Sequence, residues 1–279
     1  MASDPTWAGD VGRVWAAMHE ATDRHMQEIG ALVLERLDAR PGERIIDLGC
    51  GAGTTTRAIA EAVGPEGHVL GVDVSGDLAA QARRIVAGLP QAEVILADAA
   101  RHAFAPGRAD ALFSRHGCMF FADPAAAFAN LRRGLRPGAR VALSAFAPLA
   151  GNPWASTPMA VVEATLGPAA PVANPPPGGP FSWGDPAVFE AALAAAGFRD
   201  VGWEGRDVSM TIGAGDDPDP VERAWAVTQR IGVVARRLAD EDPAAVARVG
   251  AALRAVFAPC VRDGWVRMGG RIWLIEARA

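Results

Sequence analysis

A glycine-rich turn between two apolar segments constrains the fold of this chain more than any other feature. Residues 45–48 form a short apolar run, and Gly49, Gly51 and Gly53 follow before a helical pattern at 54–63. Glycine permits positive φ and a close backbone approach, while the first N–H groups of the helix point into the same space. The pattern therefore predicts a strand, a tight turn and a helix that together bind a cofactor.

Apolar strands and amphipathic helices alternate through most of the sequence, which is the pattern of an α/β protein. The expected strands cover residues 45–48, 68–74, 93–97, 109–113, 140–146, 201–212 and 271–277. Because the first five are nearly continuous apolar runs separated by helices, they predict a parallel sheet that is covered on both faces and binds ligands at the carboxyl ends of its strands. The last strand is expected to pair antiparallel inside this sheet.

Shifts in composition divide the chain into five expected parts. These are an N-terminal helical cap at residues 1–40, a cofactor-binding core at 41–148, a lid segment with the rest of the core at 149–212, a helical insertion at 213–268 and the last core strand at 269–279. Within the cap, residues 1–10 are expected to form an arm, and the periodicity of 11–33 predicts one or two helices.

Two further expectations concern irregular or exposed positions. Residues 148–184 are rich in proline and glycine, so we expect an irregular lid or linker there. His19 and His25 lie within the helical pattern of the cap, and both are expected to be solvated on a helix surface.

Charge and composition exclude several kinds of function. The net charge is −5 and no basic stripe is present, so we expect neither a nucleic-acid partner nor an anionic-membrane partner. The sequence contains no lysine and no tyrosine, which excludes Schiff-base chemistry, a P-loop lysine and a Tyr–Lys proton relay. Three scattered cysteines indicate neither a disulfide framework nor a zinc site. With no signal-peptide pattern and no apolar run near the ~20 residues that span a bilayer, a cytoplasmic location is expected.

Acids at the ends of successive expected strands indicate which cofactor the turn holds. Asp73 ends the second strand, where a carboxylate can bind a ribose diol. Asp98 ends the third strand and can accept from an exocyclic adenine amine, with the N–H of Ala99 facing the ring. Asp47 precedes the glycines, where it disfavours a pyrophosphate and favours an ammonium or sulfonium group. Thr54 also occupies the place of the third glycine of a dinucleotide-binding turn.

These residues resemble the motifs of class I S-adenosylmethionine-dependent methyltransferases. The likeness runs through Asp47-x-Gly49-x-Gly51-x-Gly53, Gly71-Val72-Asp73-Val74-Ser75 and Ala97-Asp98-Ala99. The stretch 113–140, with Phe120-Phe121-Ala122-Asp123-Pro124 and Leu135-Arg136-Pro137-Gly138, looks like the small-molecule branch near the ubiquinone and menaquinone methyltransferases. The resemblance implies a Rossmann-like α/β fold, with a doubly wound seven-stranded, mostly parallel sheet, an antiparallel last strand and a helical lid insertion.

The resemblance also implies a cofactor and a role for each motif residue. The cofactor is S-adenosylmethionine, and S-adenosylhomocysteine is its product. In the family the glycines approach the cofactor, one acid binds its ribose, and the residues after the fourth strand flank its methionine portion through their backbone. Carried onto this sequence, the cofactor-binding set is Asp47, Gly49, Gly51, Gly53, Asp73, Val74, Asp98, Ala99, Ser114 and Arg115.

Methyl transfer from a sulfonium is an in-line displacement, and it needs a base only when the acceptor is still protonated. His116 is the one imidazole expected at the carboxyl end of a strand, where it suits the role of general base toward an oxygen; alternatively it only packs beside the cofactor. Ser114 and the absence of lysine argue against a catalytic metal. The candidates for lining an apolar acceptor pocket are Met119, Phe120, Trp154 and Trp183.

The leading hypothesis is an enzyme that transfers a methyl group to a small-molecule acceptor without a metal, by O-methylation with His116 as base. Two alternatives stay open. One is an NAD(P)-dependent oxidoreductase, since nicotinamide cofactors also use glycine-rich turns. The other is a protein that binds S-adenosylmethionine without transferring its methyl group.

Overall fold

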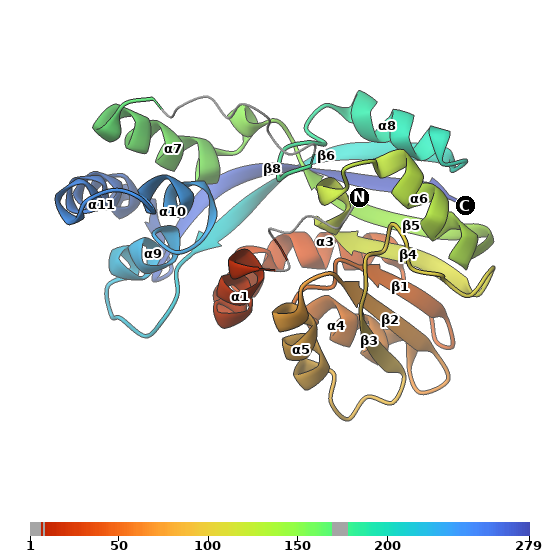
Figure 1. The fold of residues 1–279 in the computed structure, drawn as a ribbon. Helices are drawn as coiled ribbons and strands as arrows, with labels where there is room; N and C mark the ends of the chain where they lie inside the picture. The colour runs from red at the N-terminus through yellow and green to blue at the C-terminus, as the bar shows by residue number, and fades with distance from the viewer. Residues whose placement is uncertain (1–6, 8, 169–177) are drawn as a thin grey trace.

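The computed structural model describes residues 7, 9–168 and 178–279, and at its centre lies a mixed β-sheet (Figure 1). The strands are β1 (Arg44–Leu48), β2 (His68–Asp73), β3 (Ala92–Leu96), β4 (Ala109–Arg115), β5 (Leu135–Phe146), β6 (Arg199–Ile212), β7 (Val261–Arg262) and β8 (Trp265–Arg278). Their order is β3-β2-β1-β4-β5-β8-β6, with β7 paired to β8. Strands β1 to β5 are parallel, whereas β8 is antiparallel to both β5 and β6. The predicted doubly wound sheet with an antiparallel last strand is confirmed.

Helices cover both faces of the sheet. They are α1 (Asp10–Ala17), α2 (His19–His25), α3 (Gln27–Leu37), α4 (Thr54–Val63), α5 (Gly76–Ile85), α6 (Pro124–Gly134), α7 (Pro153–Leu166), α8 (Pro186–Ala195), α9 (Pro220–Thr228), α10 (Gly232–Leu238) and α11 (Pro243–Phe257), with short 3₁₀ helices at Gly117–Phe120, Leu149–Gly151 and Ala258–Cys260. Figure 1 shows α3, α4 and α5 on one face and α6 and α8 on the other. Since both faces are covered, the central strands are buried, as their apolar sequences predict.

Asp-Pro pairs begin four of the helices. The aspartate side chain accepts a hydrogen bond from a backbone N–H in the first turn, and proline takes the first helical position, where no N–H is needed. These capping bonds run from Ala126 N to Asp123 at 3.0 Å, from Ala187 N to Asp185 at 3.0 Å, from Val221 N to Asp219 at 2.8 Å and from Ala245 N to Asp242 at 2.7 Å. Local sequence therefore fixes where α6, α8, α9 and α11 start.

Several expected elements differ from those observed. The cap contains three helices rather than one or two, because the chain leaves helical geometry at Met18 and Met26. The segment expected to be irregular contains the 14-residue helix α7, which tolerates Pro158 in its interior. Residues 1–6 and 8 of the expected arm, and 169–177 of the expected lid, lie outside the described residues.

A second apolar core lies beyond the main sheet. Strands β6 and β8 are each 14 residues long, and their paired far ends extend to α7, α9, α10 and α11 (Figure 1). The buried residues of this core are Val162, Ile212, Ala224, Trp225, Val234, Leu238, Val249, Leu253, Phe257, Val266 and Met268. Helix α7 therefore packs together with the helical insertion expected after β6. The paired strands β6 and β8, which we call the ribbon, form the base of this second core.

The expectation that no apolar run is long enough to span a bilayer is wrong for one helical segment. Within the described chain, Pro243–Cys260 is long and apolar enough to cross a membrane by length and composition. Core helices of soluble proteins meet the same criterion. Here the apolar side of α11 contributes Val249, Leu253 and Phe257 to the second core, while Arg254 pairs with Glu222 on α9.

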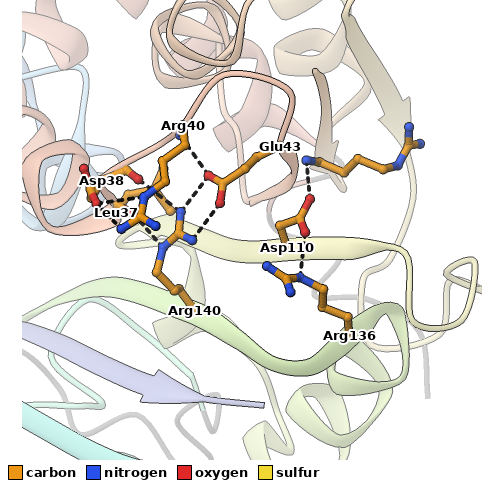
Figure 2. A network of polar contacts seen from close by, with 8 residues as sticks. Leu37, Asp38, Arg40, Glu43, Asp110, Arg136 and Arg140 are labelled. Carbon is orange, nitrogen blue, oxygen red and sulfur yellow. Dashed lines mark hydrogen bonds and ion pairs between the residues drawn. The ribbon is translucent and has the colours of Figure 1, made fainter. Parts of the chain in front are cut away.

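An arginine network fastens the cap to the start of the sheet (Figure 2). Arg140 of β5 donates to both carboxylate oxygens of Glu43 at 2.7 Å, and it also reaches two backbone carbonyls at the end of α3. Beside it, Arg136 pairs with Asp110 at 2.6 Å. Side chains of Arg140 and Glu43 are only 16% and 12% exposed. This network lies at the opposite end of β1 from the glycine turn, so it supports the fold away from the candidate site.

Candidate functional site

The glycine turn between β1 and α4 has a backbone that glycine adopts most readily. Gly49, Gly51 and Gly53 have φ values of 65°, 56° and 92°. A Cβ at Gly49 would lie 2.9 Å from the Cα of Gly117, and one at Gly53 would be equally crowded by Ala82. By contrast, a Cβ at Gly51 would meet no described atom within 4 Å. The middle of the turn therefore borders open space where a ligand can approach the backbone.

Asp47 presents a buried carboxylate beneath this turn. Its Oδ2 accepts hydrogen bonds from the hydroxyls of Thr55 at 2.9 Å and Thr56 at 2.7 Å, both in the first turn of α4. Its Oδ1 is buried and has no hydrogen-bond partner among the described residues. Burial raises the pKa of Asp47 to about 6, although the two threonine hydrogen bonds oppose this shift. The spare oxygen is suited to a cation or an N–H donor.

Asp73, at the end of β2, connects two parts of the site. Its Oδ2 accepts from the N–H of Gly51 at 2.8 Å, and its Oδ1 accepts from the N–H of Ser75 at 2.9 Å. The residue is 8% exposed, and burial raises its pKa while these backbone hydrogen bonds oppose the rise. Each carboxylate oxygen keeps a second lone pair, so Asp73 can hold the turn and still accept from a hydroxyl. Val74 follows it and is half-buried.

Asp98 and Ala99 follow the end of β3, on the same edge of the sheet. Asp98 Oδ1 accepts from Ala100 N at 3.0 Å, and its side chain is 24% exposed. Ala99 is buried, and its carbonyl accepts from the Asn130 amide at 2.9 Å. The parallel pairing of β1, β2 and β3 therefore brings the three sequence-predicted acids to one edge.

Ser114 and Arg115 end β4 and use their side chains for contacts within the protein. Ser114 is fully buried, and its Oγ donates to the carbonyl of Leu48 at 2.8 Å, which holds β4 to the start of the glycine turn. Arg115 Nη2 donates to Asp23 Oδ1 of α2 at 2.8 Å. The sequence predicts that Ser114 and Arg115 flank the methionine portion of the cofactor through their backbone. The side-chain contact of Arg115 with the cap was not predicted.

His116 is buried in a left-handed conformation directly after β4. Its φ is 66° and it is 4% exposed. Nδ1 lies 2.9 Å from Ser144 Oγ on β5, and hydrogen bonding to Ser144 opposes the lowering of the pKa of the ring. In the tautomer that donates to the Ser144 hydroxyl, the ring proton is on Nδ1. Nε2 is then an acceptor, and no described residue bonds to it.

The surroundings keep His116 uncharged. Burial lowers its pKa to about 3, the hydrogen bond to Ser144 opposes this shift, and the nearby charge of Arg115 adds to it. The imidazole packs against Phe146 with 4.0 Å between ring centroids. The imidazole is therefore neutral and can accept a proton at Nε2, and the lowered pKa makes it a weak base in this buried environment.

Aromatic side chains from β5, α7, α2 and the turn that contains Phe181 form a wall next to His116. The ring centroid of Phe146 on β5 lies 5.0 Å from Trp154 on α7 and 5.6 Å from Phe181. Trp154 in turn packs edge-on against His25 of α2 at 4.8 Å. We call Phe146, Trp154, Phe181 and His25 the aromatic wall. Of these four residues, only Trp154 was predicted from the sequence to line an acceptor pocket. The other three carry no local sequence signal of a binding site.

Met119 and Phe120 lie in the 3₁₀ turn after His116. Met119 is 1% exposed, and its Sδ accepts from the Phe146 N–H at 3.3 Å. The ring of Phe120 packs edge-on against Trp7 at 5.1 Å. Met119 therefore contacts the aromatic wall, whereas Phe120 contacts the cap, and a role for either in binding an acceptor stays a prediction.

Trp183 lies on the other side of the sheet from the cap. It is 2% exposed and packs against Phe128 of α6 and Phe189 of α8, at 5.6 Å and 5.7 Å between ring centroids. These contacts make it part of the packed core between α6 and α8. We therefore leave Trp183 out of the proposed acceptor site.

The structure overturns the expectation that His25 is solvated. Its Nδ1 lies 3.0 Å from the carbonyl oxygen of Thr211, and burial lowers the pKa of the ring to about 4. His19 is partly buried beside Gln81 of α5, with 3.2 Å between their Nε2 atoms. The partner of His25 is 186 positions away in sequence, so helical periodicity alone could not reveal this contact.

Two hollows in the surface lie elsewhere. One, of about 420 Å³, is bordered by Trp225, Val246 and Arg254 in the second core. The other, of about 380 Å³, is bordered by Arg83, Gly88 and Val94 near β3. Neither is lined by the glycine turn or His116.

Comparison with known proteins identifies the family. A methyltransferase domain model matches residues 45–138, from β1 into β5. Over 196 residues, 67% of this chain, the sequence is 33% identical to a nocamycin O-methyltransferase from Saccharothrix syringae, of which it covers 70%. The chain belongs to the class I S-adenosylmethionine-dependent methyltransferases.

Other similarities of this methyltransferase are shorter or concern the fold alone. It is 32% identical over 123 residues to a demethylmenaquinone methyltransferase from Beutenbergia cavernae, covering 44% of this chain and 47% of that protein. A solved structure of an S-adenosylmethionine-dependent methyltransferase from Aquifex aeolicus shares the fold, with a TM-score of 0.51, 19% identity and coverage of 74% of this chain and 94% of that one. The chain spans 36%, 70% and 28% of the lengths of three curated relatives.

Proposed function

We propose that this methyltransferase transfers a methyl group from S-adenosylmethionine to an oxygen atom of a small, uncharged acceptor, with His116 as the general base. The observation that carries the proposal is a pair of buried atoms without described partners, Asp47 Oδ1 and His116 Nε2. The segments that bear them touch, since Gly117 lies against Gly49. One atom suits the cofactor and the other suits an acceptor hydroxyl.

The residues of the turn fit the cofactor. Gly51 borders open space, Asp47 offers a spare carboxylate oxygen for an ammonium or sulfonium group, and Asp73 retains lone pairs for the ribose hydroxyls. Asp98 and Ala99 would hold the adenine, while Ser114 and Arg115 would flank the methionine portion. Three carboxylates on one edge also disfavour a pyrophosphate, so the NAD(P) alternative fits this site poorly.

When bound, S-adenosylmethionine supplies a methyl carbon on a sulfonium sulfur, so that the acceptor oxygen bonds to this carbon while the carbon–sulfur bond breaks and its electron pair stays on sulfur. His116 Nε2 receives the acceptor's proton, and Ser144 holds the ring in the required orientation. The aromatic wall excludes water from this exchange and offers the acceptor an apolar surface.

Two observations favour an uncharged acceptor and oxygen as the atom methylated. His25 and His116 both have pKa values lowered by burial, to about 4 and about 3, so neither imidazole offers a positive charge to an anionic acceptor near neutral pH. The nocamycin relative is named as an O-methyltransferase.

Calorimetry followed by a transfer assay tests the proposal. We expect S-adenosylmethionine to bind the wild-type protein and NADH not to bind. Methyl-labelled cofactor should then label phenols or quinols in an acceptor panel, and His116→Asn should slow the transfer while the cofactor still binds. NADH binding without S-adenosylmethionine binding would refute the site assignment. Cofactor binding without transfer to any acceptor class would favour the non-transferring alternative, and labelling of amines alone would refute O-methylation.

A further inference from the structure

Three consecutive residues of α2 contact three separate parts of the protein. Asp23 bonds to the cofactor side of the site, Arg24 stacks on the start of β8, and His25 joins the aromatic wall. Successive residues of an α-helix are about 100° apart around its axis, so Asp23 and His25 point in nearly opposite directions. Helix α2 therefore lies between the glycine turn and the aromatic wall and contacts both.

Asp23 connects the cap to both sides of the glycine turn. Its Oδ1 accepts from Arg115 at the end of β4, at 2.8 Å, and its Oδ2 accepts from the hydroxyl of Thr54 at 2.6 Å. Thr54 is the first residue of α4 and directly follows Gly53. The side chains of Arg115 and Asp23 are 14% and 19% exposed, so this ion pair is largely shielded from solvent. Asp23 therefore links the cap both to the glycine turn and to the end of β4.

His25 connects the same helix to the acceptor side. Its Nδ1 donates to the carbonyl of Thr211 at the far end of β6, and its ring packs on Trp154 of α7. Arg24 stacks on Trp265 at the start of β8, with 4.2 Å from the guanidinium carbon to the ring centroid. A movement of α2 would therefore change its contacts with β6, β8 and α7 together.

The chain permits α2 to move as one short unit. Helical geometry is interrupted before it at Met18, with φ −109° and ψ 19°, and after it at Met26, with φ −96° and ψ 7°. Seven residues separate these two interruptions. Backbone hydrogen bonds such as Met18 N to Val14 O at 3.0 Å and Gly30 N to Met26 O at 2.8 Å still join α2 to its neighbours, so a shift of α2 would be a change of angle at these two positions.

We propose that Asp23 and His25 are positioning residues that couple the cofactor turn to the aromatic wall, so that cofactor binding orders the acceptor side of the site. This inference rests on the proposed cofactor site. Coupling of this kind is reciprocal in binding free energy: if the cofactor orders Trp154 through α2, an acceptor held by the wall strengthens cofactor binding by the same factor.

Hydrogen exchange measured with and without S-adenosylhomocysteine tests the coupling. In the wild-type protein we expect the ligand to slow amide exchange by about fivefold at the glycine turn and also in α7 and around Thr211. In His25→Ala the protection at the turn should persist while the protection of α7 is lost. His25→Asn places an amide donor near the former Nδ1, and it should restore part of that protection.

A second pair of variants tests the cofactor end of the helix. Asp23→Asn removes the ion pair with Arg115, so we expect weaker S-adenosylhomocysteine binding and no transmitted protection. Glu20→Gln removes the same charge from an exposed position of α2 and should behave as wild type. Thermal unfolding shows whether each variant is folded, and the histidine variants test the coupling even if Asp23→Asn is unstable.

The outcomes separate this coupling from the proposed function. Absence of S-adenosylhomocysteine binding to the wild-type protein would overturn the proposed function and the coupling with it. Binding with protection confined to the glycine turn would overturn the coupling alone. Unchanged α7 protection in His25→Ala would likewise overturn it, because the contact would then carry no effect.

Discussion

The backbone N–H of Gly51 donates to Asp73 Oδ2 at 2.8 Å, so the acid that ends β2 holds the turn that follows β1. The same carboxylate accepts from Ser75 N through its other oxygen. The shape of the turn and the position of the proposed ribose-binding acid therefore depend on each other. A change at either residue will alter both.

Replacing Asp73 with Asn should weaken cofactor binding and loosen the turn. The amide has one acceptor oxygen, so it can satisfy Gly51 N or Ser75 N but not both, and we expect a loss of about 1–3 kcal/mol in the free energy of unfolding. S-adenosylhomocysteine affinity should fall at least about tenfold, a loss of about 1.4 kcal/mol. Calorimetry and denaturant unfolding measure the two effects. Asp77→Asn, exposed on α5, is the control, and equal affinities in both variants would contradict the assignment.

Gly51→Ala should separate cofactor binding from stability. The new Cβ meets no described atom, and the positive φ costs about 1–2 kcal/mol, so the variant should fold. The methyl group would occupy the space in which the cofactor approaches the backbone, so binding should be lost. Gly88→Ala also has a positive φ and open surroundings, on a turn away from the site. It should lose similar stability and retain full affinity; parallel affinity losses would show that Gly51 does not border the ligand.

Cofactor affinity should depend on pH through Asp47. Burial raises its pKa to about 6, and a cationic group is bound better by the ionised carboxylate. Below that pH the ionised fraction of Asp47 falls about tenfold per pH unit. The dissociation constant of S-adenosylhomocysteine should therefore increase as pH falls, by a factor that approaches about tenfold per pH unit. Titrations across this range in the wild-type protein and in Asp47→Asn measure the effect. The variant should bind weakly and without this pH dependence, and a persistent slope would assign the titration to another group.

His116→Asn should lower the rate of methyl transfer without abolishing cofactor binding. Asparagine tolerates the left-handed backbone better than most residues, so the turn should be preserved. Removing a general base lowers the rate by about 10²–10⁴-fold. Because burial lowers the pKa of His116 to about 3, its ionisation should produce no acid limb near pH 6.5 in the wild-type profile. A limb near that pH that disappears in the variant would show that the ring titrates normally in the working enzyme.

Glu43→Gln should destabilise the fold and leave the site intact. Removing one partner of a buried ion pair leaves Arg140 without its countercharge, and we expect a loss of about 2–4 kcal/mol in the free energy of unfolding.

Burial alone would raise the pKa of Glu43, but the hydrogen bonds from Arg140 outweigh it and the pKa is lowered from 4.5. A lowered acid pKa gives stability that is present above 4.5 and is lost as pH falls through the folded-state value. Unfolding at neutral and acid pH should show this loss in the wild-type protein and a smaller one in the variant. Glu61→Gln, from an exposed pair with Arg57, is the control.

The part of the fold that follows local rules could be predicted from the sequence. The β1 strand, the glycine turn and α4 are adjacent in sequence, and each acid at a strand end is placed by the length of its own strand. Asp-Pro pairs are equally local signals, and they mark the starts of α6, α8 and α11. Parallel pairing then brings those ends together without further information.

The acceptor side could not be predicted in this way because its contacts are long-range. His25 meets Thr211 across 186 positions, and Arg115 meets Asp23 across 92. Helix α7 was missed because prolines and glycines surround it, and its buried residues Ala155, Pro158 and Val162 gain their environment only from the second core. Phe146 and Phe181 look like ordinary core residues until β5 and α7 are placed side by side.

The long ribbon of β6 and β8 also makes this protein a practical scaffold for grafting. One end of the ribbon completes the central sheet, and the other end carries α9, α10 and α11 between its two strands. Since the chain leaves and re-enters through neighbouring strands, residues 213–264 can be exchanged for the corresponding segment of a relative without cutting the half that holds the glycine turn. Chimaeras built at these two junctions would vary the helices of the second core while the glycine turn, His116 and the aromatic wall stay those of this chain.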